Sequence, residues 1–264
     1  MLEVEFAQIS DRGRVRPGNE DSLGHVVPAT PQEAQTRGWL FAVADGVGGH
    51  DKGEVASAKA IEAILEGFRK GGGGEALSSL LPRLVQRANA SVFEDAIASG
   101  SHGMATTMVA CALRYDRAVV AHVGDSRCYL LRNGQATLLT RDHTVASEHA
   151  RLGLLSEEEV AEAETRHLLT RSLGTGLTVS VDVADHQILP DDVLLLCSDG
   201  LYGSVRGQEM AELVNHEHNL DLVARKLVML ANERDGGDNI TAQLVRVRSV
   251  ERVGMYRGRP YKIR

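Results

Sequence analysis

The sequence contains little cysteine, few aromatic residues and no apolar run of the length that a bilayer requires. Its three cysteines, Cys111, Cys128 and Cys197, are far apart, and each lies among apolar residues. Because no CxxC pair is present, zinc is not indicated and we expect buried, reduced thiols. The first residues lack a basic segment followed by a long apolar run, so no secretory signal is predicted. These features predict a soluble protein of the cytoplasm.

The chain also has fewer basic than acidic residues. The chain has 29 Lys and Arg against 36 Asp and Glu, which gives a formal net charge of -7. This balance argues against nucleic acid or an anionic membrane surface as the main partner. The remaining composition is ordinary for a globular protein, at 43% hydrophobic and 25% charged residues. A chain of 264 residues can bury a substantial core, and no repeat or linker requires two domains.

Apolar patterning predicts a mixture of strands and helices. Strands are predicted where apolar residues alternate or run together, over residues 3–9, 22–27, 39–44, 187–189, 193–197 and 240–247. Helices are predicted over residues 54–68, 77–92, 208–214 and 220–231. Four short apolar runs between residues 104 and 140, with a hairpin signal at Asn133-Gly134, predict an antiparallel meander.

Polar segments connect these elements. Residues 28–37 are interpreted as a connector, and residues 141–173 as a mobile excursion over the sheet with a short helix that begins near Ser156. Residues 249–264 are basic, have no clear period and are predicted to form a tail. Residues 71–74 are all glycine, but no Lys-Ser/Thr pair follows them, so they predict a flexible connector rather than a phosphate-binding loop.

Acidic residues occur at the ends of predicted strands and in two loops. Three apolar runs end in Asp45, Asp125 and Asp199, and the two loops contribute Glu20, Asp21 and Asp238. If the strand ends meet, these carboxylates repel each other, and some take up protons at neutral pH unless cations bind. An all-oxygen set without paired His or Cys indicates Mg²⁺ or Mn²⁺ rather than zinc. Two such ions, roughly 3.5–4 Å apart, can clamp a phosphoryl displacement, and Arg16 is placed to contact the phosphate.

Simpler interpretations stay open for single residues. An Asp-Gly step after a strand is usually only a turn, and a structural turn stays open for Asp125 beside Ser126. A solvated surface position stays open for Arg16. The histidines are interpreted as structural or solvated, with His122 and His143 in the first class and His216 and His218, at a helix end, in the second.

The chain resembles the metal-dependent protein phosphatase family, type 2C, in its bacterial form. The matching motifs occur in the order of that family and are SDRG at 10–13, VR at 15–16, NEDS at 19–22, ADGVGGH at 44–50, GEVAS at 53–57, GMATT at 103–107, VGDSR at 123–127, TRSLG at 170–174, SDGL at 198–201 and DNIT at 238–241. The resemblance implies an α+β fold with four α-β-β-α layers, two stacked antiparallel sheets flanked by helices. It implies a catalytic domain over residues 1–248, with a flap at about 141–173, followed by the basic tail at 249–264.

The same resemblance implies roles for the acidic residues. Asp45 would bridge two Mn²⁺ or Mg²⁺ ions, and the Gly46 carbonyl would bind one of them. Asp199 and Asp238 would hold the other ion. Arg16 would hold the substrate phosphate, and a water that bridges the metals would be the nucleophile, so no covalent phospho-enzyme is expected.

Further ligands are implied with less direct contacts. Glu20 and Asp21 would contribute near the second ion, in part through water. Asp125 resembles the residue that supports a third, weaker metal together with Asp199. Many members of the family carry an aspartate where this chain has Gly203, so occupancy of the third site stays open.

One position departs from the eukaryotic members of the family. They have a histidine soon after the bridging aspartate, proposed as the general acid, whereas this chain has Val47, an apolar residue as in bacterial members. His50 is nearby in the sequence, but we assign it no role in proton transfer. A metal-bound water is the alternative donor to the leaving group.

The resulting prediction is metal-dependent hydrolysis of phosphoserine and phosphothreonine on proteins, by an enzyme that opposes a bacterial Ser/Thr kinase and acts as a monomer. Two alternatives stay open. The enzyme could serve one dedicated phosphorylated regulator. A catalytically dead member of the same fold could bind a phosphoprotein or kinase, although the full set of carboxylates argues against this reading.

Overall fold

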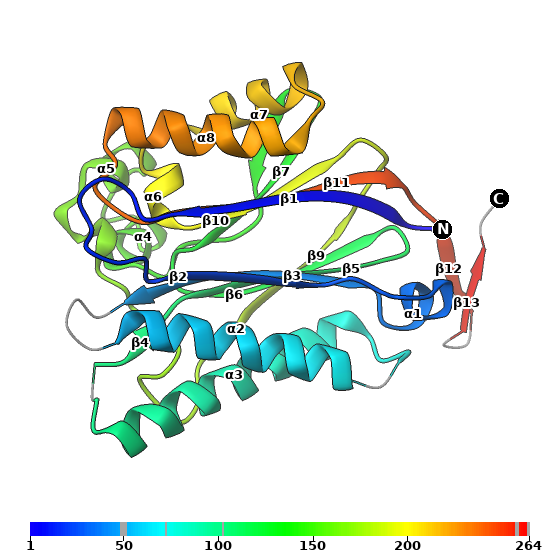
Figure 1. Cartoon of the computed structure of the whole chain (residues 1–264), viewed down its shortest axis with the longest axis horizontal. Coiled ribbons are helices and arrows are strands. Elements are labelled where there is room, and N and C mark those ends of the chain that lie inside the picture. Colours follow the sequence, from blue (N-terminus) through cyan, green and yellow to red (C-terminus); the bar gives the residue numbers. More distant parts are fainter. Residues whose placement is uncertain (48–51, 72, 102, 257–258, 263–264) are drawn as a thin grey trace.

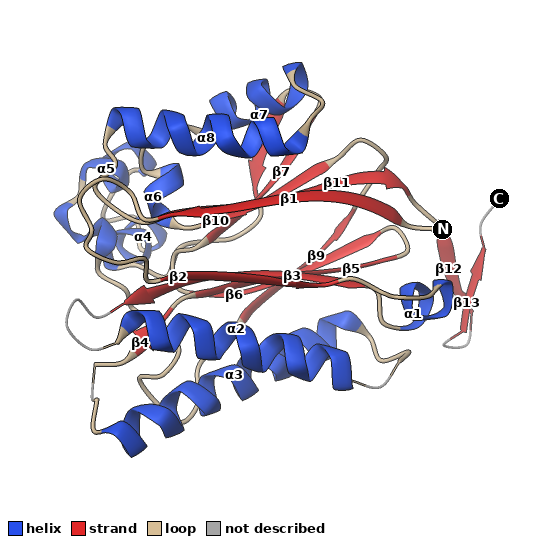
Figure 2. Cartoon of the chain, in the orientation of Figure 1, coloured by secondary structure: helices blue, strands red, loops and turns tan. Residues whose placement is uncertain are grey.

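A computed structural model describes residues 1–47, 52–71, 73–101, 103–256 and 259–262 of the chain. Two antiparallel sheets face each other at its centre, and helices cover both outer faces (Figure 1). Figure 2 shows the same four layers by secondary structure, with the strands in the middle and the long helices outside. The predicted α-β-β-α sandwich is therefore confirmed.

The first sheet has five strands in the order β1-β11-β10-β7-β8, and α7 and α8 cover its outer face (Figure 1). The bounds of these elements are β1 Glu3–Asp11, β7 Arg127–Arg132, β8 Gln135–Leu138, β10 Val193–Cys197, β11 Ile240–Ser249, α7 Gly207–His216 and α8 Leu220–Arg234. Leu195 and Leu244 of the sheet belong to the same buried cluster as Val223 and Leu227 of α8. The helical layer thus buries the outer face of this sheet.

The second sheet has the strand order β2-β3-β5-β6-β9, with the short β4 paired to β3, and α2 and α3 cover its outer face (Figure 1). The bounds are β2 Asp21–Val26, β3 Trp39–Val47, β4 Ala105–Thr106, β5 Met108–Arg114, β6 Arg117–Val123, β9 Asp182–Gln187, α2 Gly53–Lys70 and α3 Leu77–Ser99. Ile64 and Phe68 of α2 pack with Leu81 of α3 and with the outer residues of the strands.

The strand β3 is apolar from Trp39 to Ala44, and both of its faces are covered there. Leu40, Ala42 and Ala44 pack in the cluster beneath α2 and α3, whereas Phe41 and Val43 pack between the two sheets. All five side chains are fully buried. A strand covered on both faces shows a continuous apolar run instead of an alternation. The run predicted from sequence therefore carries Asp45 at the end of a rigid, central strand.

The predicted meander between residues 104 and 140 is wrong in its connectivity. β5 and β6 pair as a hairpin in the second sheet, whereas β7 and β8 pair as a hairpin in the first. The chain crosses between the sheets at Gly124, whose φ is +99°, and a Cβ there would lie 2.7 Å from Cγ2 of Thr107. Local turn signals do not reveal such a crossing, because a turn between two apolar runs does not specify which sheet each run joins.

Smaller elements complete the fold. The predicted connector contains α1 (Pro31–Thr36), which Thr30 caps with its side chain. The predicted flap contains α4 (Val145–Arg151), α5 (Glu157–Glu162) and the 3₁₀ helix η1 (Glu164–His167), and Ser156 opens α5 with a capping box. Within residues 249–264, β12 (Val253–Tyr256) pairs with β13 (Arg259–Lys262). In the described part of the chain, no helix has the length and apolarity that a membrane crossing needs.

Candidate metal centre

Strand direction brings the acidic residues together. β3 and β6 both pair antiparallel with β5, so they run in the same direction and end at the same edge of the second sheet. β2 begins where β3 ends, and Asp21 lies directly opposite Asp45. In the first sheet, β10 ends before Asp199 beside the start of β11, which follows Asp238. Five aspartates from separate segments therefore lie at one end of the sandwich, namely Asp21, Asp45, Asp125, Asp199 and Asp238.

A cleft of about 410 Å³ opens at this end. Its lining consists of Arg16, Glu20, Asp45, Gly46, Val47, Asp125, His167, Leu169, Asp199, Asp238 and Asn239. Of the predicted site residues, all line the cleft except Asp21, which lies buried beneath it and accepts a hydrogen bond at Oδ2 from Ser198 Oγ, 2.7 Å away. His50 lies outside the described residues.

Burial and mutual repulsion raise the pKa values of three carboxyl groups in this region. Burial, followed by the charges of Asp21 and Asp199, raises the pKa of Asp45 well above its usual range. Burial and the charge of Asp199 raise the pKa of Asp125 to about 7, and burial raises the pKa of Asp21 to about 6. Acidic groups in this state favour a nearby positive charge, which lets them ionise at neutral pH.

Two buried carboxylate oxygens in the cluster indicate where that positive charge fits. Asp21 Oδ1 and Asp199 Oδ1 are both buried, and neither has a hydrogen-bond partner among the described residues. A buried oxygen without a partner is costly, and a bound cation removes the cost. The surrounding donors are carboxylates and the Gly46 carbonyl, which is the ligand chemistry of Mg²⁺ and Mn²⁺. The residues present therefore fit divalent ions of this class.

The backbone around Asp45 is held on both sides. Its N–H donates to Thr107 Oγ1 at 2.9 Å, and its carbonyl accepts from the Thr107 N–H at 2.8 Å. On the other side, the Gly46 N–H donates to the Glu20 carbonyl at 3.1 Å. A Cβ at Gly46 would lie only 2.3 Å from the carbonyl oxygen of Gly53. Glycine is required here because three backbone segments meet beside the cluster.

The loop that carries Arg16 and Glu20 is organised by Asn239. The Asn239 side chain accepts from the Glu20 N–H at 2.8 Å and donates to the carbonyls of Arg12 and Gly18, at 2.8 and 2.9 Å. Arg16 Nη2 in turn donates to Asp238 Oδ2 at 2.8 Å. The loop from the N-terminal strand is thus fastened to the residues that precede β11, and Arg16 stands at the mouth of the cleft.

The flap supplies two residues that sequence reasoning did not identify. His167 and Leu169 line the cleft, and His167 Nδ1 lies 3.6 Å from Asp199 Oδ2. The neighbouring Asp199 carboxylate raises the pKa of His167 against the opposing effect of burial. No motif marks these positions, because only the path of the flap places them over the strand ends.

A second group of potential metal ligands lies under the flap. Atoms of His122, His143 and Asp182 lie within 4.8 Å of one another. However, Arg171 Nη1 donates to Asp182 Oδ1 at 2.8 Å and lies 3.2 Å from His143 Nε2. The guanidinium already supplies a positive charge to this carboxylate. We interpret the group as an ion-paired structural cluster, in line with the expectation for its two histidines.

The fold and the acidic cleft together define a metal-dependent phosphatase. The protein phosphatase 2C family model matches residues 9–240. The chain therefore belongs to the protein phosphatase 2C family, as its motifs predict.

Several characterised proteins are similar over almost the whole chain. The sequence is 35% identical to the serine/threonine phosphatase stp of Listeria innocua, over 98% of this chain and 99% of that protein. It is 34% identical to the serine/threonine protein phosphatase PstP of Mycobacterium tuberculosis, over 91% of this chain and 44% of that protein. The structure of Stp1 from Staphylococcus aureus matches with a TM-score of 0.85 at 30% identity, over 94% of this chain and 96% of that one.

A structure that contains metal is also similar. The catalytic domain of PstP in complex with 2 manganese ions matches with a TM-score of 0.78 at 31% identity. The match covers 94% of this chain and 100% of that one.

Proposed function

We propose that this chain hydrolyses phosphoserine and phosphothreonine on proteins with the help of two Mn²⁺ or Mg²⁺ ions. The observation that carries this proposal is the meeting of Asp45, Asp199 and Asp238 with Arg16 at one cleft. The relatives that are named serine/threonine phosphatases, and the one solved with manganese, support the same reaction.

The proposed ligands follow from their places in the cleft. Asp45 and the Gly46 carbonyl would face the centre from the second sheet, and Asp199 and Asp238 would face it from the first. When bound, the ions would supply an activated water as nucleophile and offset the charge of the phosphoryl group. Because Asp45 lies between the two sheets, its carboxylate would be placed to bind both ions.

Outer positions are assigned to the remaining acidic residues. Glu20 lines the cleft, whereas Asp21 lies beneath it, so both would act near the second ion and in part through water. Asp125 lines the cleft with Asp199 and would support a third, weaker ion. Gly203, four residues after Asp199, offers no side-chain ligand to that ion.

Arg16 is assigned to the substrate phosphate. Its guanidinium stands at the rim of the cleft, and its side chain is 45% exposed, so an incoming phosphoryl group can reach it. Arginine matches the geometry of a phosphate with two parallel N–H donors. The Arg16 side chain would therefore orient the phosphoryl group towards the carboxylate cluster.

A Ser/Thr protein kinase is the counterpart that we propose for this activity. We further propose that the chain acts as a monomer in the cytoplasm. The three cysteines are free thiols, as a reducing compartment favours. Light scattering in solution tests the monomer, and a phosphoproteome with and without the protein tests the substrates.

The decisive experiment is Mn²⁺-dependent release of phosphate from a phosphothreonine peptide. We expect turnover that requires the ion and that Asp238→Ala or Asp45→Asn largely abolishes. A folded wild-type protein that releases no phosphate at saturating Mn²⁺ would overturn the proposal. That result would instead favour a non-catalytic phosphoprotein-binding role.

A further inference from the structure

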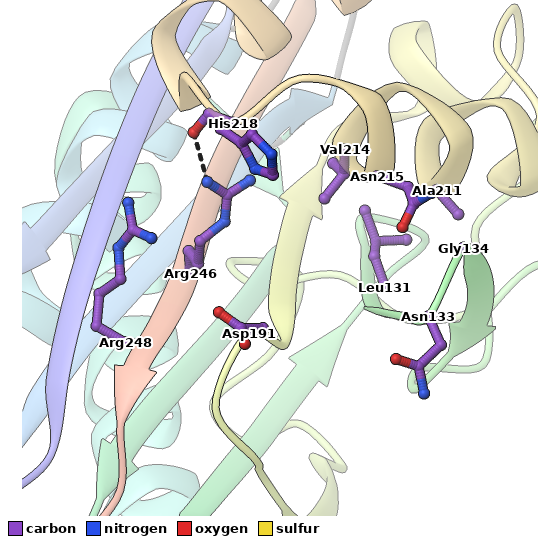
Figure 3. A pocket seen from close by; sticks show the side chains of 10 residues that line it. All are labelled: Leu131, Asn133, Gly134, Asp191, Ala211, Val214, Asn215, His218, Arg246 and Arg248. Carbon is purple, nitrogen blue, oxygen red and sulfur yellow. Dashed lines mark hydrogen bonds between the residues drawn. The ribbon is translucent and has the colours of Figure 1, made fainter.

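A second pocket lies at the end of the first sheet that is opposite to the acidic cleft, and Figure 3 shows the residues that line it. This distal pocket has a volume of about 140 Å³ and is lined by Leu131, Asn133, Gly134, Asp191, Ala211, Val214, Asn215, His218, Arg246 and Arg248. Within the sheet, Cys197 pairs with Ala242 at the catalytic end and Val193 pairs with Arg246 at this end. Four strand residues at roughly 3.4 Å each separate the two ends by about 14 Å. The distal pocket is therefore separate from the acidic cleft.

Arg246 is the most buried cation of the distal pocket, with only 4% of the residue exposed. Its guanidinium donates to the carbonyl oxygen of His218 (Figure 3). Nη2 also lies 3.4 Å from the carbonyl oxygen of Glu217. Both carbonyls are neutral, and they lie just after the end of α7. No carboxylate forms an ion pair with Arg246 in the described part of the chain.

The other arginines of this sheet differ from Arg246 in that respect. Arg127 donates from Nε and Nη2 to the Asp142 carboxylate, and Arg132 makes the same double contact with Asp192. Arg248 pairs with Glu5 on the neighbouring strand. Each of these three guanidinium groups thus has a carboxylate partner, whereas Arg246 has only carbonyl partners.

The charged groups in and beside the distal pocket are of both signs, but Arg246 itself has no ion-pair partner among the described residues. Arg246, Arg248 and Asp191 line it together with His218. Arg248 is paired with Glu5 outside the lining, whereas Asp191 forms no ion pair with Arg246 in the described part of the chain. Burial, and then the nearby Arg248, lower the pKa of Arg246, and the more weakly acting charges of Glu5 and Asp191 oppose this shift. A buried cation without an anionic partner is unfavourable, and an oxyanion in the pocket would offset the cost.

We propose that the distal pocket binds a phosphate-type oxyanion, either as free orthophosphate or as the phosphoryl group of a phosphorylated protein side chain. The volume of about 140 Å³ suits a group of the size of a phosphate, and the planar guanidinium, with its two parallel N–H donors, suits a tetrahedral oxyanion. Asn133 and Asn215 at the rim add amide groups that can donate to further oxygens. This inference does not rest on the catalytic proposal, because binding here needs neither metal ions nor turnover.

The proposed binding of an oxyanion is tested by a substitution that introduces a carboxylate into the distal pocket. His218 is exposed, so His218→Glu places a competing anion beside Arg246 without a change in the core. The matched control is His216→Glu, the same substitution two residues away, at an exposed residue that does not line the pocket. A second variant, Arg246→Lys, keeps the positive charge but removes the paired N–H donors of the guanidinium.

Binding is measured by amide NMR shifts of the Mg²⁺-loaded protein during titration with orthophosphate, with chloride at matched ionic strength. We expect saturable shifts at Gly134, Asn215 and His218, distinct from those of the acidic cleft. His218→Glu should weaken this binding at least about tenfold, Arg246→Lys should weaken it also, and His216→Glu should leave it unchanged. No saturable shift at these amides, or equal affinity in both glutamate variants, would overturn the proposal.

The two sources of the oxyanion are separated by a second titration. A peptide that carries a non-hydrolysable phosphonate analogue of phosphothreonine is compared with orthophosphate and with the unmodified peptide. Tighter binding of the phosphonate peptide assigns the pocket to a phosphorylated protein, and binding of orthophosphate alone assigns it to the free ion. Equal binding of the unmodified peptide would contradict recognition of a phosphate group.

Discussion

Arg16 and Asp238 form an ion pair across the mouth of the acidic cleft, with Nη2 2.8 Å from Oδ2. The proposed phosphate ligand is therefore tied to a proposed metal ligand. Both side chains are partly exposed, at 45% and 36%, and exposed pairs of this kind contribute only about 0–1 kcal/mol. A cation on Asp238 would compete for its carboxylate and release the guanidinium. Metal and phosphate binding should consequently reinforce each other.

The first prediction concerns Arg16. Arg16→Lys keeps the positive charge but loses the bidentate contact with phosphate, which should lower kcat/KM by about tenfold or more, mainly through KM. Steady-state kinetics with a phosphothreonine peptide at fixed Mn²⁺ measure the effect. Arg14→Lys in the same exposed loop is the control and should behave as wild type. An unchanged KM in Arg16→Lys would contradict the assignment.

The second prediction concerns Asp45, where activity and stability should change in opposite directions. Asp45→Asn removes a buried charge that faces Asp21 and Asp199, so the metal-free protein should become more stable, by roughly 1–2 kcal/mol. Activity should fall at least about a hundredfold. Thermal unfolding with and without Mn²⁺ provides the readout, because bound ions stabilise the folded state. A variant that keeps the full Mn²⁺-dependent rise in Tm would refute the role of Asp45 as a ligand.

The third prediction concerns Asn239, which holds the loop that carries Arg16. Asn239→Ala removes three hydrogen bonds to backbone groups and should destabilise the fold by roughly 2–3 kcal/mol. Urea unfolding measures this loss, and KM should rise because Arg16 is no longer positioned. Asn232→Ala, which removes one side-chain bond to Asp11, should cost clearly less. Equal costs in the two variants would argue against a positioning role for Asn239.

The fourth prediction is a loss of stability in mild acid. Burial, and then the neighbouring His122, lower the pKa of His143 to about 4. The unfolded chain protonates this imidazole near pH 6.5, so the unfolded state binds the extra proton between these values. The stability that the neutral form contributes is complete above about pH 6.5 and is lost as the pH falls towards 4, by roughly 2–3 kcal/mol.

Urea unfolding between pH 7 and pH 5 tests this dependence, in a range where most carboxylates stay ionised. His143→Gln has no proton to gain, so its stability should change less with pH than that of the wild type. The same slope in the variant and in the wild type would assign the acid sensitivity to other groups.

Much of this fold could be predicted from the sequence because the pattern of each element is local. The run that ends at Asp45 is apolar on both faces, and helix α2 shows its buried face at regular spacing. The acidic cluster could be predicted as well, since carboxylates after apolar strands are visible in the sequence. Their gathering at one end of the sandwich follows from the direction of the strands.

Other features depend on contacts that no local pattern carries. The crossing at Gly124 sends two similar hairpins to different sheets, and only tertiary packing decides between them. His167 enters the cleft because the flap folds back over Asp199. Asn239 was visible within a motif, but its three bonds to the loop of residues 12–20 join opposite ends of the chain. The distal pocket likewise arises from residues of several elements.

The pairing of β1 with β11 has a consequence for synthesis on the ribosome. β11 is the strand partner of β1 in this sheet and also the last strand of the sheet along the chain. The strand Glu3–Asp11 therefore lacks its neighbour until residues 240–249 have emerged, and pairing between such distant segments forms slowly. Asp238 emerges just before β11. A nascent chain thus completes its proposed set of metal ligands and its first sheet in the same late step, so we expect interrupted synthesis to yield no active phosphatase.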